Sequence, residues 1–284
     1  MKRLLVSMFQ TKCSTILVEN QEWERIMDKK DFIGIFDSGI GGISVLKHAV
    51  TELENEDFIF YGDCGHFPYG EKTPAEVRKY TMDSCRELYR EGAKAILIAC
   101  NTATSAAVID MREEFRIPVI SMEPAIKPAH LENETGKILV MATPGTIHSD
   151  RFQRLVDRVG CEDRLIRIAC EGLASLVEKG DFESEEIREY VRNKFSPYSG
   201  QEICGIVIGC THYSFITPLI LEVAREFFTG RMKAYDGMYG TVAHLKDILS
   251  RDGKLRSDDH KGTVRFLTSG TDEDLTLMQE IYYK

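Results

Sequence analysis

Residues 95–102 read Ala-Ile-Leu-Ile-Ala-Cys-Asn-Thr, and residues 205–212 read Gly-Ile-Val-Ile-Gly-Cys-Thr-His. Each stretch is an apolar run followed by a cysteine and two polar residues. Continuous apolar runs of this length are typical of strands in a parallel sheet that is covered on both faces. The two stretches lie 110 residues apart. They therefore predict two related units, each with a cysteine at the carboxyl end of a buried strand.

The rest of the chain repeats this alternation. Strands are predicted at 32–36, 58–61, 94–99, 117–121, 137–142, 165–169, 204–209, 232–235 and 263–267. Helices are predicted at 41–53, 74–91, 103–115, 148–159, 171–179, 183–195, 215–228, 240–251 and 271–283. Strands that alternate with helices form parallel sheets with helices on both faces. The expected fold class is α/β, with two pseudo-symmetric doubly wound lobes and the active site in the cleft between them.

The expected division of the chain follows from these two units. Residues 31–127 and 240–284 form the first lobe, and residues 128–239 form the second. Residues 1–30 show no clear periodicity, so we expect an extension outside the catalytic core.

The composition excludes some classes of protein. Of 284 residues, 43% are hydrophobic and 29% are charged, which is typical of a globular protein. The 36 basic and 45 acidic residues give a net charge of −9, so no nucleic-acid partner is expected. No run approaches the roughly 20 apolar residues of a membrane span, and the N-terminus lacks a signal peptide. The expected location is the cytoplasm, without a membrane partner.

The cysteines favour neither a metal site nor a disulfide framework. They lie at positions 13, 64, 85, 100, 161, 170, 204 and 210. No pair has the CxxC spacing of zinc and thioredoxin sites. Disulfide frameworks belong to short secreted chains, so we expect reduced thiols.

Cys100 and Cys210 occupy matching positions, each between a strand and a helix. A helix N-terminus lowers the pKa of a thiol, so we expect both cysteines to favour the thiolate. Two opposed acid/base groups can remove a proton from one face of a carbon and return one to the other, as racemisation requires. The alternative is that both are ordinary buried cysteines, a residue type that is often buried. The pattern alone leaves both interpretations open.

Three other segments carry polar residues at strand ends or in loops. Residues 37–42, Asp-Ser-Gly-Ile-Gly-Gly, end the first strand, and backbone N–H groups there can hold a carboxylate or simply begin a helix. In the glycine-rich loop 61–73, Tyr69 is placed to cover a small ligand. His212 lies two residues after Cys210 and is a candidate proton partner. Glu178 is predicted to be a solvated residue at a helix end.

Together, and in this order, the motifs resemble those of the glutamate racemase family. The matching segments are Gly34–Leu46, Tyr61–Thr73, Ala99–Ser105, Ile120–Pro128, Ala142–Thr146, Gly209–Phe215 and Tyr235–Thr241. The resemblance covers about residues 32–270. The chain departs from the family pattern at 170–178, before the glutamate position, and at its tail.

The resemblance implies cofactor-independent interconversion of L-glutamate and D-glutamate, supplying D-glutamate for peptidoglycan. It implies Cys100 and Cys210 as the catalytic bases, assisted by Asp37 and His212, with no metal. The residues that it implies for substrate binding are Asp37, Ser38, Tyr69, Gly70, Asn101, Thr102, Thr143, Thr146, Thr211 and His212. Glutamate is the expected small-molecule partner, and the resemblance is compatible with a homodimer.

Two alternatives remain at this stage. One is a related aspartate or hydantoin racemase, although residues 68–70 and 211–212 favour glutamate. The other is a non-catalytic binding module that inhibits a nucleic-acid enzyme, against which the intact cysteine pair argues.

Overall fold

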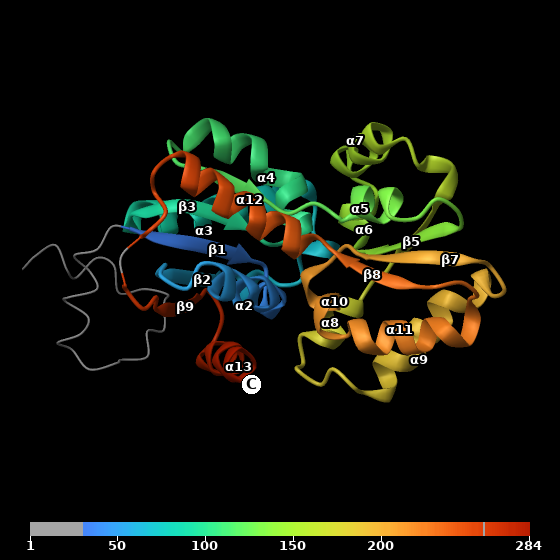
Figure 1. Cartoon of the computed structure of the whole chain (residues 1–284). Helices are drawn as coiled ribbons and strands as arrows, with labels where there is room; N and C mark the ends of the chain where they lie inside the picture. The colour runs from blue at the N-terminus through green and yellow to red at the C-terminus, as the bar shows by residue number, and fades with distance from the viewer. Residues whose placement is uncertain (1–30, 258) are drawn as a thin grey trace, which may run out of the picture.

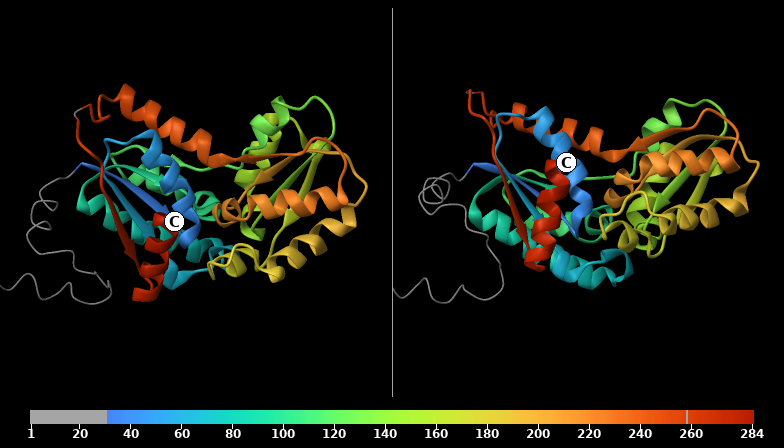
Figure 2. Two further views of the ribbon diagram at one scale, coloured as in Figure 1. Left: turned by 60° about the horizontal axis from the view of Figure 1, so that its bottom comes forward. Right: turned by 90° about the horizontal axis from the view of Figure 1, so that it is seen from below.

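Two parallel sheets, each between layers of helices, form two lobes that lie side by side (Figures 1 and 2). The computed structural model describes residues 31–257 and 259–284, so the predicted extension at 1–30 lies outside the described residues. The first sheet contains β1 (Phe32–Asp37), β2 (Phe58–Gly62), β3 (Ala93–Ile98), β4 (Val119–Ser121) and β9 (Val264–Thr268). The second contains β5 (Lys137–Ala142), β6 (Leu165–Ala169), β7 (Ile203–Ile208) and β8 (Lys233–Asp236). The nine predicted strands and the α/β fold class are confirmed.

Four strands of the first sheet follow the same order as the four strands of the second, and β9 is an additional edge strand. The first sheet runs β4-β3-β1-β2-β9 and the second, read from β8, runs β8-β7-β5-β6. All pairings are parallel. In each lobe the chain reverses its direction of winding between the two central strands, β1 and β3 or β5 and β7. Ligands in such sheets bind outside the carboxyl ends of the strands at this reversal.

The helices cover both faces of each sheet. In the first lobe they are α2 (Ile43–Glu52), α3 (Pro74–Glu91), α4 (Asn101–Glu114), α12 (Gly237–Arg251) and α13 (Asp272–Tyr283). In the second they are α5 (Ile126–Leu131), α6 (Pro144–Ile147), α7 (Asp150–Val159), α8 (Leu173–Val177), α9 (Glu185–Phe195), α10 (Thr211–Phe215) and α11 (Thr217–Phe227). Short 3-10 helices lie at Ile40–Gly42, Cys64–His66, Tyr69–Glu71, Glu162–Arg164 and Ser196–Tyr198. None of the helices in the described ranges is long and apolar enough to cross a membrane.

The predicted helices differ from the observed ones mainly near prolines. The helix expected at 215–228 is α11, which begins at Thr217 with Pro218 in its first turn, a position that favours a helix start. The short helix α10 before it was not predicted. The short helix α5 was not predicted; prolines, such as Pro128 within it, generally disfavour a helix.

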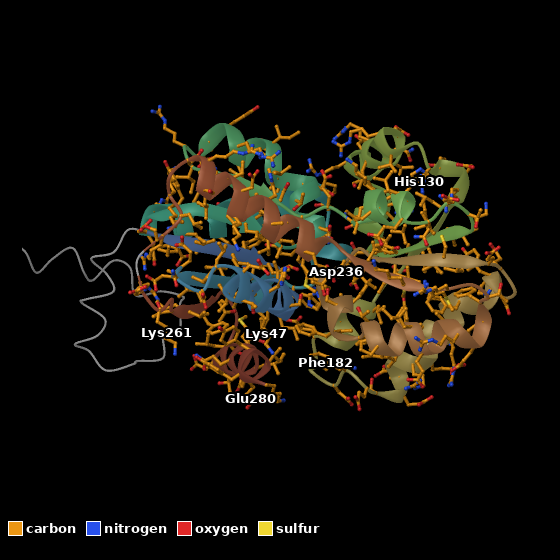
Figure 3. All side chains as sticks on the ribbon, viewed as in Figure 1. Lys47, His130, Phe182, Asp236, Lys261 and Glu280 are labelled. Atoms are coloured by element: carbon orange, nitrogen blue, oxygen red, sulfur yellow. The ribbon has the colours of Figure 1, made fainter. Side chains whose placement is uncertain are left out.

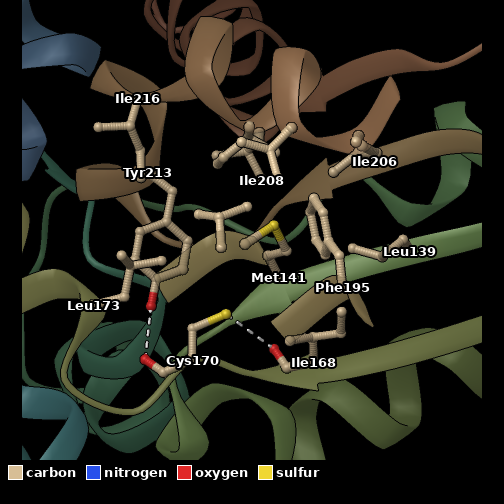
Figure 4. Close-up of a cluster of buried hydrophobic side chains, with 14 of the residues drawn as sticks. Leu139, Met141, Ile168, Cys170, Leu173, Phe195, Ile206, Ile208, Tyr213 and Ile216 are labelled. Atoms are coloured by element: carbon tan, nitrogen blue, oxygen red, sulfur yellow. Dashed lines mark hydrogen bonds between the residues drawn. The ribbon is translucent and has the colours of Figure 1, made fainter. Parts of the chain in front are cut away.

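Each central strand buries both faces, which explains why its residues are apolar throughout. In β5, Leu139 and Met141 point into the cluster drawn in Figure 4, with α9 and α11 around it. Ile138 and Val140 point to the opposite face and pack with α5 and α7. Tyr213 reaches into the first cluster, where its hydroxyl donates to a backbone carbonyl oxygen 3.0 Å away.

The lobes are packed against each other at their junction. The chain crosses between them after β4 and again after β8. The two crossing segments lie close together, because a Cβ atom on Gly237 would clash with the carbonyl oxygen of Glu123. Asp236 and Phe182 lie at this junction (Figure 3). Phe182 packs against the cores of both lobes and stacks on Phe215, with ring centroids 4.7 Å apart. The lobes therefore meet through close side-chain and backbone contacts.

Candidate active site

A small cavity, about 20 Å³ in volume, lies between the lobes, and residues that follow β1, β3, β5 and β7 line it. Ten of the twelve predicted site residues are in its lining: Ser38, Tyr69, Gly70, Cys100, Asn101, Thr102, Thr143, Cys210, Thr211 and His212. Four lining residues were not predicted: Phe67, Pro68, Ala174 and Gly209. The carboxyl ends of parallel strands lie at one edge of each sheet, and residues that follow these ends in both lobes line the same cavity.

Asp37 and Thr146 lie behind the lining. The fully buried Asp37 carboxylate accepts hydrogen bonds from Thr211 Oγ1 at 3.0 Å and from the backbone N–H of Gly39 at 3.2 Å. Thr146 Oγ1 lies 3.3 Å from Thr102 Oγ1 and 3.1 Å from that of Thr143. Both residues are therefore placed to orient the groups that face the cavity.

Cys100 lies between β3 and α4 and caps the helix. Its Sγ accepts from the backbone N–H of Ala103 at 3.4 Å and lies 3.5 Å from Ser38 Oγ. These donors favour the thiolate, as the sequence suggested. Burial and the nearby Asp37 carboxylate outweigh them, however, and raise the pKa of Cys100 to about 12. The predicted lowering of the thiol pKa is therefore wrong for Cys100.

Cys210 faces the cavity from the second lobe and has an ionisable partner. Its Sγ lies 3.8 Å from Nδ1 of His212, and the other ring nitrogen of His212 lies 2.5 Å from Oε2 of Glu178. Burial by itself lowers the pKa of His212, but Glu178 and Cys210 raise it by more, so it lies well above its usual value. His212 is therefore placed between a carboxylate and a thiol, both of which favour its protonated form.

Glu178 is not the solvated residue that the sequence predicted. Its side chain is 17% exposed, and it forms an ion pair with His212. It also accepts hydrogen bonds from the backbone N–H of Ile40 in the first lobe, at 3.2 Å to each oxygen. Local sequence could not reveal this role, because it depends on contact between segments 138 residues apart. Only the glutamate position of the family pattern pointed to it.

Second-lobe side chains lie close to the backbone of the glycine-rich segment after β1. A Cβ atom on Gly39 would lie 2.6 Å from Oε1 of Glu178, and one on Gly41 would lie 2.5 Å from Nδ1 of His212. Burial raises the pKa of Asp37, at the start of this segment, to about 6. The carboxylate that the Ile40 N–H holds is the protein's own Glu178.

A hydrogen-bond network holds the loop that carries Tyr69. The buried Tyr69 hydroxyl donates a short hydrogen bond to Asp63. Asp63 also accepts from Ser269 Oγ at 2.5 Å and lies 2.9 Å from Nδ1 of His66. His66 stacks on Tyr80, with ring centroids 3.9 Å apart. These contacts fix the tyrosine ring against the cavity.

The described ranges contain no cluster of three or more histidine, cysteine, aspartate or glutamate side chains that could hold a metal ion.

Comparison with known proteins agrees with this geometry. The model of the Asp/Glu/Hydantoin racemase family matches residues 46–238. Glutamate racemase from Clostridium perfringens is 43% identical over 244 residues, which are 86% of this chain and 92% of the relative. This chain belongs to the glutamate racemase family.

Solved structures of racemases share the fold. Glutamate racemase from Bacillus anthracis superposes with a TM-score of 0.77 at 27% identity, covering 89% of this chain and 94% of that one. Glutamate racemase from Francisella tularensis in complex with D-glutamate gives a TM-score of 0.77 at 26% identity, covering 90% and 94%. The two-lobed arrangement of this racemase is therefore that of its family.

Proposed function

We propose that this racemase interconverts L-glutamate and D-glutamate, with Cys100 and Cys210 as the two acid/base groups. The observation that carries the proposal is that both thiols line one cavity, one from each lobe, at matching strand ends. Family membership supports glutamate as the substrate, since relatives that share over 40% of their residues with this chain are glutamate racemases.

The reaction needs one proton to leave the α-carbon and another to arrive on the opposite face. A thiolate on one cysteine takes the α-proton, so the C–H bond breaks and its electron pair stays on the substrate. The thiol of the other cysteine then gives its proton to that carbon and becomes the thiolate. The product has inverted configuration, and the two sulfurs have exchanged their protonation states.

The two thiols differ in their surroundings. Cys210 lies beside His212, which is paired with Glu178, so an ionisable group is placed to exchange a proton with this thiol. Cys100 has only neutral donors, Ser38 and the Ala103 N–H, so it holds its proton in the free enzyme. The two cysteines are therefore assisted by different groups, an ionisable pair at Cys210 and neutral donors at Cys100.

The other lining groups are suited to a small dicarboxylate. Hydroxyl, amide and backbone donors can hold its carboxylates without a cluster of cations. Thr102 and Thr143 come from different lobes, and their hydroxyl oxygens lie 2.9 Å apart. Residues from both lobes therefore converge on one ligand, and contact between the lobes excludes water from it.

Further expectations from the sequence belong to this proposal. The D-glutamate would supply peptidoglycan synthesis in the cytoplasm, which is the use that the family resemblance implies. Residues 31–127 with 240–284 are proposed as one lobe and 128–239 as the other, and each sheet draws its strands from one of these sets. The homodimer stays a prediction, which analytical ultracentrifugation can test.

Circular dichroism of each glutamate enantiomer tests the activity directly. Wild-type protein should bring both to the same racemic mixture, and Cys100→Ser and Cys210→Ser should each lower kcat by about 10²–10⁴-fold. Cys161→Ser, which changes a buried thiol outside the cavity, is the control. Full two-way activity in both variants would refute the two-thiol mechanism. Faster racemisation of aspartate than of glutamate would instead overturn the substrate.

A further inference from the structure

One cysteine outside the proposed mechanism contacts the catalytic network. Of the cysteines that the sequence left without a role, Cys13 lies outside the described residues. Four are buried away from the site lining: Cys85, Cys161, Cys170 and Cys204. Cys64 differs, because it is only partly buried and its Sγ donates to Oε1 of Glu178 at 3.7 Å.

The thiol is part of a cradle that the first lobe forms around a carboxylate of the second lobe. Cys64 and the backbone N–H of Ile40 both donate to Oε1 of Glu178. Oε2 accepts from the same N–H and from Nε2 of His212. The carboxylate is therefore held by first-lobe donors while it faces its partner in the second lobe.

The backbone of Gly39 also restricts the space around the Glu178 carboxylate. A Cβ atom on Gly39 would lie 2.6 Å from Oε1 and 2.7 Å from Oε2 of Glu178, so there is no room for a side chain at this position. Removing the Cys64 sulfur would open one wall of this cradle. Burial, followed by the charge of Glu178, raises the pKa of Cys64 well above its usual range, so the thiol stays a donor.

We infer that Cys64 is a positioning residue that orients Glu178 toward His212 and so acts on Cys210 from the first lobe. The inference rests on the proposed function only in its effect on catalysis. Its structural part, the influence of Cys64 on the charge of His212, can be measured without substrate.

The ionisable groups that face His212 and Cys64 determine how a change at Cys64 can alter the pKa of His212. Glu178, Cys210 and Asp37 face His212. Glu178, Asp274 and Asp37 face Cys64. Among the described residues, only Glu178 both forms an ion pair with His212 and accepts a hydrogen bond from Cys64. A change at Cys64 should therefore reach His212 through this carboxylate.

The test compares Cys64→Ala, which removes the donor, with Cys64→Ser, which keeps one. In Cys64→Ala, Glu178 gains freedom to turn toward solvent, and the His212 imidazolium loses part of its stabilisation. NMR titration of His212 should then show a pKa lower by roughly one unit, a shift of the size that a charged hydrogen bond produces. Cys64→Ser should restore the wild-type value, and Cys161→Ala should leave it unchanged.

The catalytic part is tested by the pH profile of glutamate racemisation. In Cys64→Ala the basic limb of the kcat profile should move to lower pH with the His212 titration, and kcat should fall several-fold. In a Glu178→Gln background, Cys64→Ala should have no further effect on either quantity. If Cys64→Ala does not fold, Cys64→Val provides the same readout, because it also removes the donor while filling the space of the sulfur.

An unchanged His212 pKa in Cys64→Ala would overturn the inference, and so would a Cys64→Ser variant that behaves like Cys64→Ala. Effects that add in the Glu178→Gln background would show that Cys64 does not act through Glu178. Absence of glutamate racemisation in the wild-type protein would instead overturn the proposed function, while the titration would still decide the role of Cys64.

Discussion

Substituting Gly41 by alanine places an atom where the second lobe already lies. The new Cβ would be 2.5 Å from Nδ1 of His212 and 2.7 Å from its backbone nitrogen, and it would also overlap Thr211 Oγ1. The backbone nitrogen belongs to the start of α10 and cannot rotate away. The clash must therefore be relieved by moving α10, and with it His212, away from the first lobe.

The size of this movement can be derived from the contact distance. To reach an ordinary separation of 3.4 Å, His212 must retreat by about 0.9 Å. A misplacement of about 1 Å in a catalytic group costs roughly 10²-fold in rate, which corresponds to about 2.7 kcal/mol of transition-state stabilisation. Overpacking of this kind also lowers the free energy of unfolding by about 1–3 kcal/mol.

The assay measures kcat/KM for both glutamate enantiomers by circular dichroism, together with urea unfolding. Gly41→Ala should lose about 10²-fold in kcat/KM in both directions, because the equilibrium between enantiomers cannot change. Gly240→Ala is the matched control, since its Cβ meets nothing within 4 Å and lies inside α12. That variant should keep full activity and gain about 0.5–1 kcal/mol in stability.

Wild-type kcat/KM in Gly41→Ala would refute the reasoning, because it would mean that the lobes need not approach this closely for catalysis. A large loss of stability with normal activity in the folded fraction would lead to the same conclusion. A loss of activity in Gly240→Ala would show that alanine substitutions perturb the enzyme without a local clash.

Two further substitutions test groups that lie behind the cavity. Burial raises the pKa of Asp37 from 3.8 to about 6, so its ionisation destabilises the fold as pH rises through this window. Asp37→Asn should remove this loss. In urea unfolding, the free energy of unfolding of the variant relative to wild type should rise by about 3 kcal/mol from acid to neutral pH. A difference that does not vary with pH would contradict burial as the cause. Tyr69→Phe removes the hydroxyl that donates to the buried Asp63, so we expect a loss of about 1–3 kcal/mol and a higher KM for glutamate. Unchanged KM and melting temperature would show that this hydrogen bond does not hold the loop.

Local sequence was sufficient where a segment's own residues determine its structure. The apolar runs of β3 and β7 predict buried strands because both of their faces are covered. The bounds of α3, Pro74–Glu91, match the prediction, since Thr73 and Glu76 form a capping box and Gly92 ends the helix in a left-handed conformation. The short helix α5 escaped prediction because its two nearby prolines favour a loop.

The sequence by itself determined the α/β alternation, the two related lobes and the placement of Cys100 and Cys210 at strand ends. Only the tertiary structure decided the partners of these thiols. Glu178 forms an ion pair with His212 because α8 packs beside α10 and against the first lobe. Local sequence patterns do not encode this packing between distant segments. The helix N-terminus predicts a lowered pKa for Cys100, but burial and Asp37 reverse it. Strand ends follow from local periodicity, whereas charge states depend on which groups the folded chain brings together and how completely it excludes water.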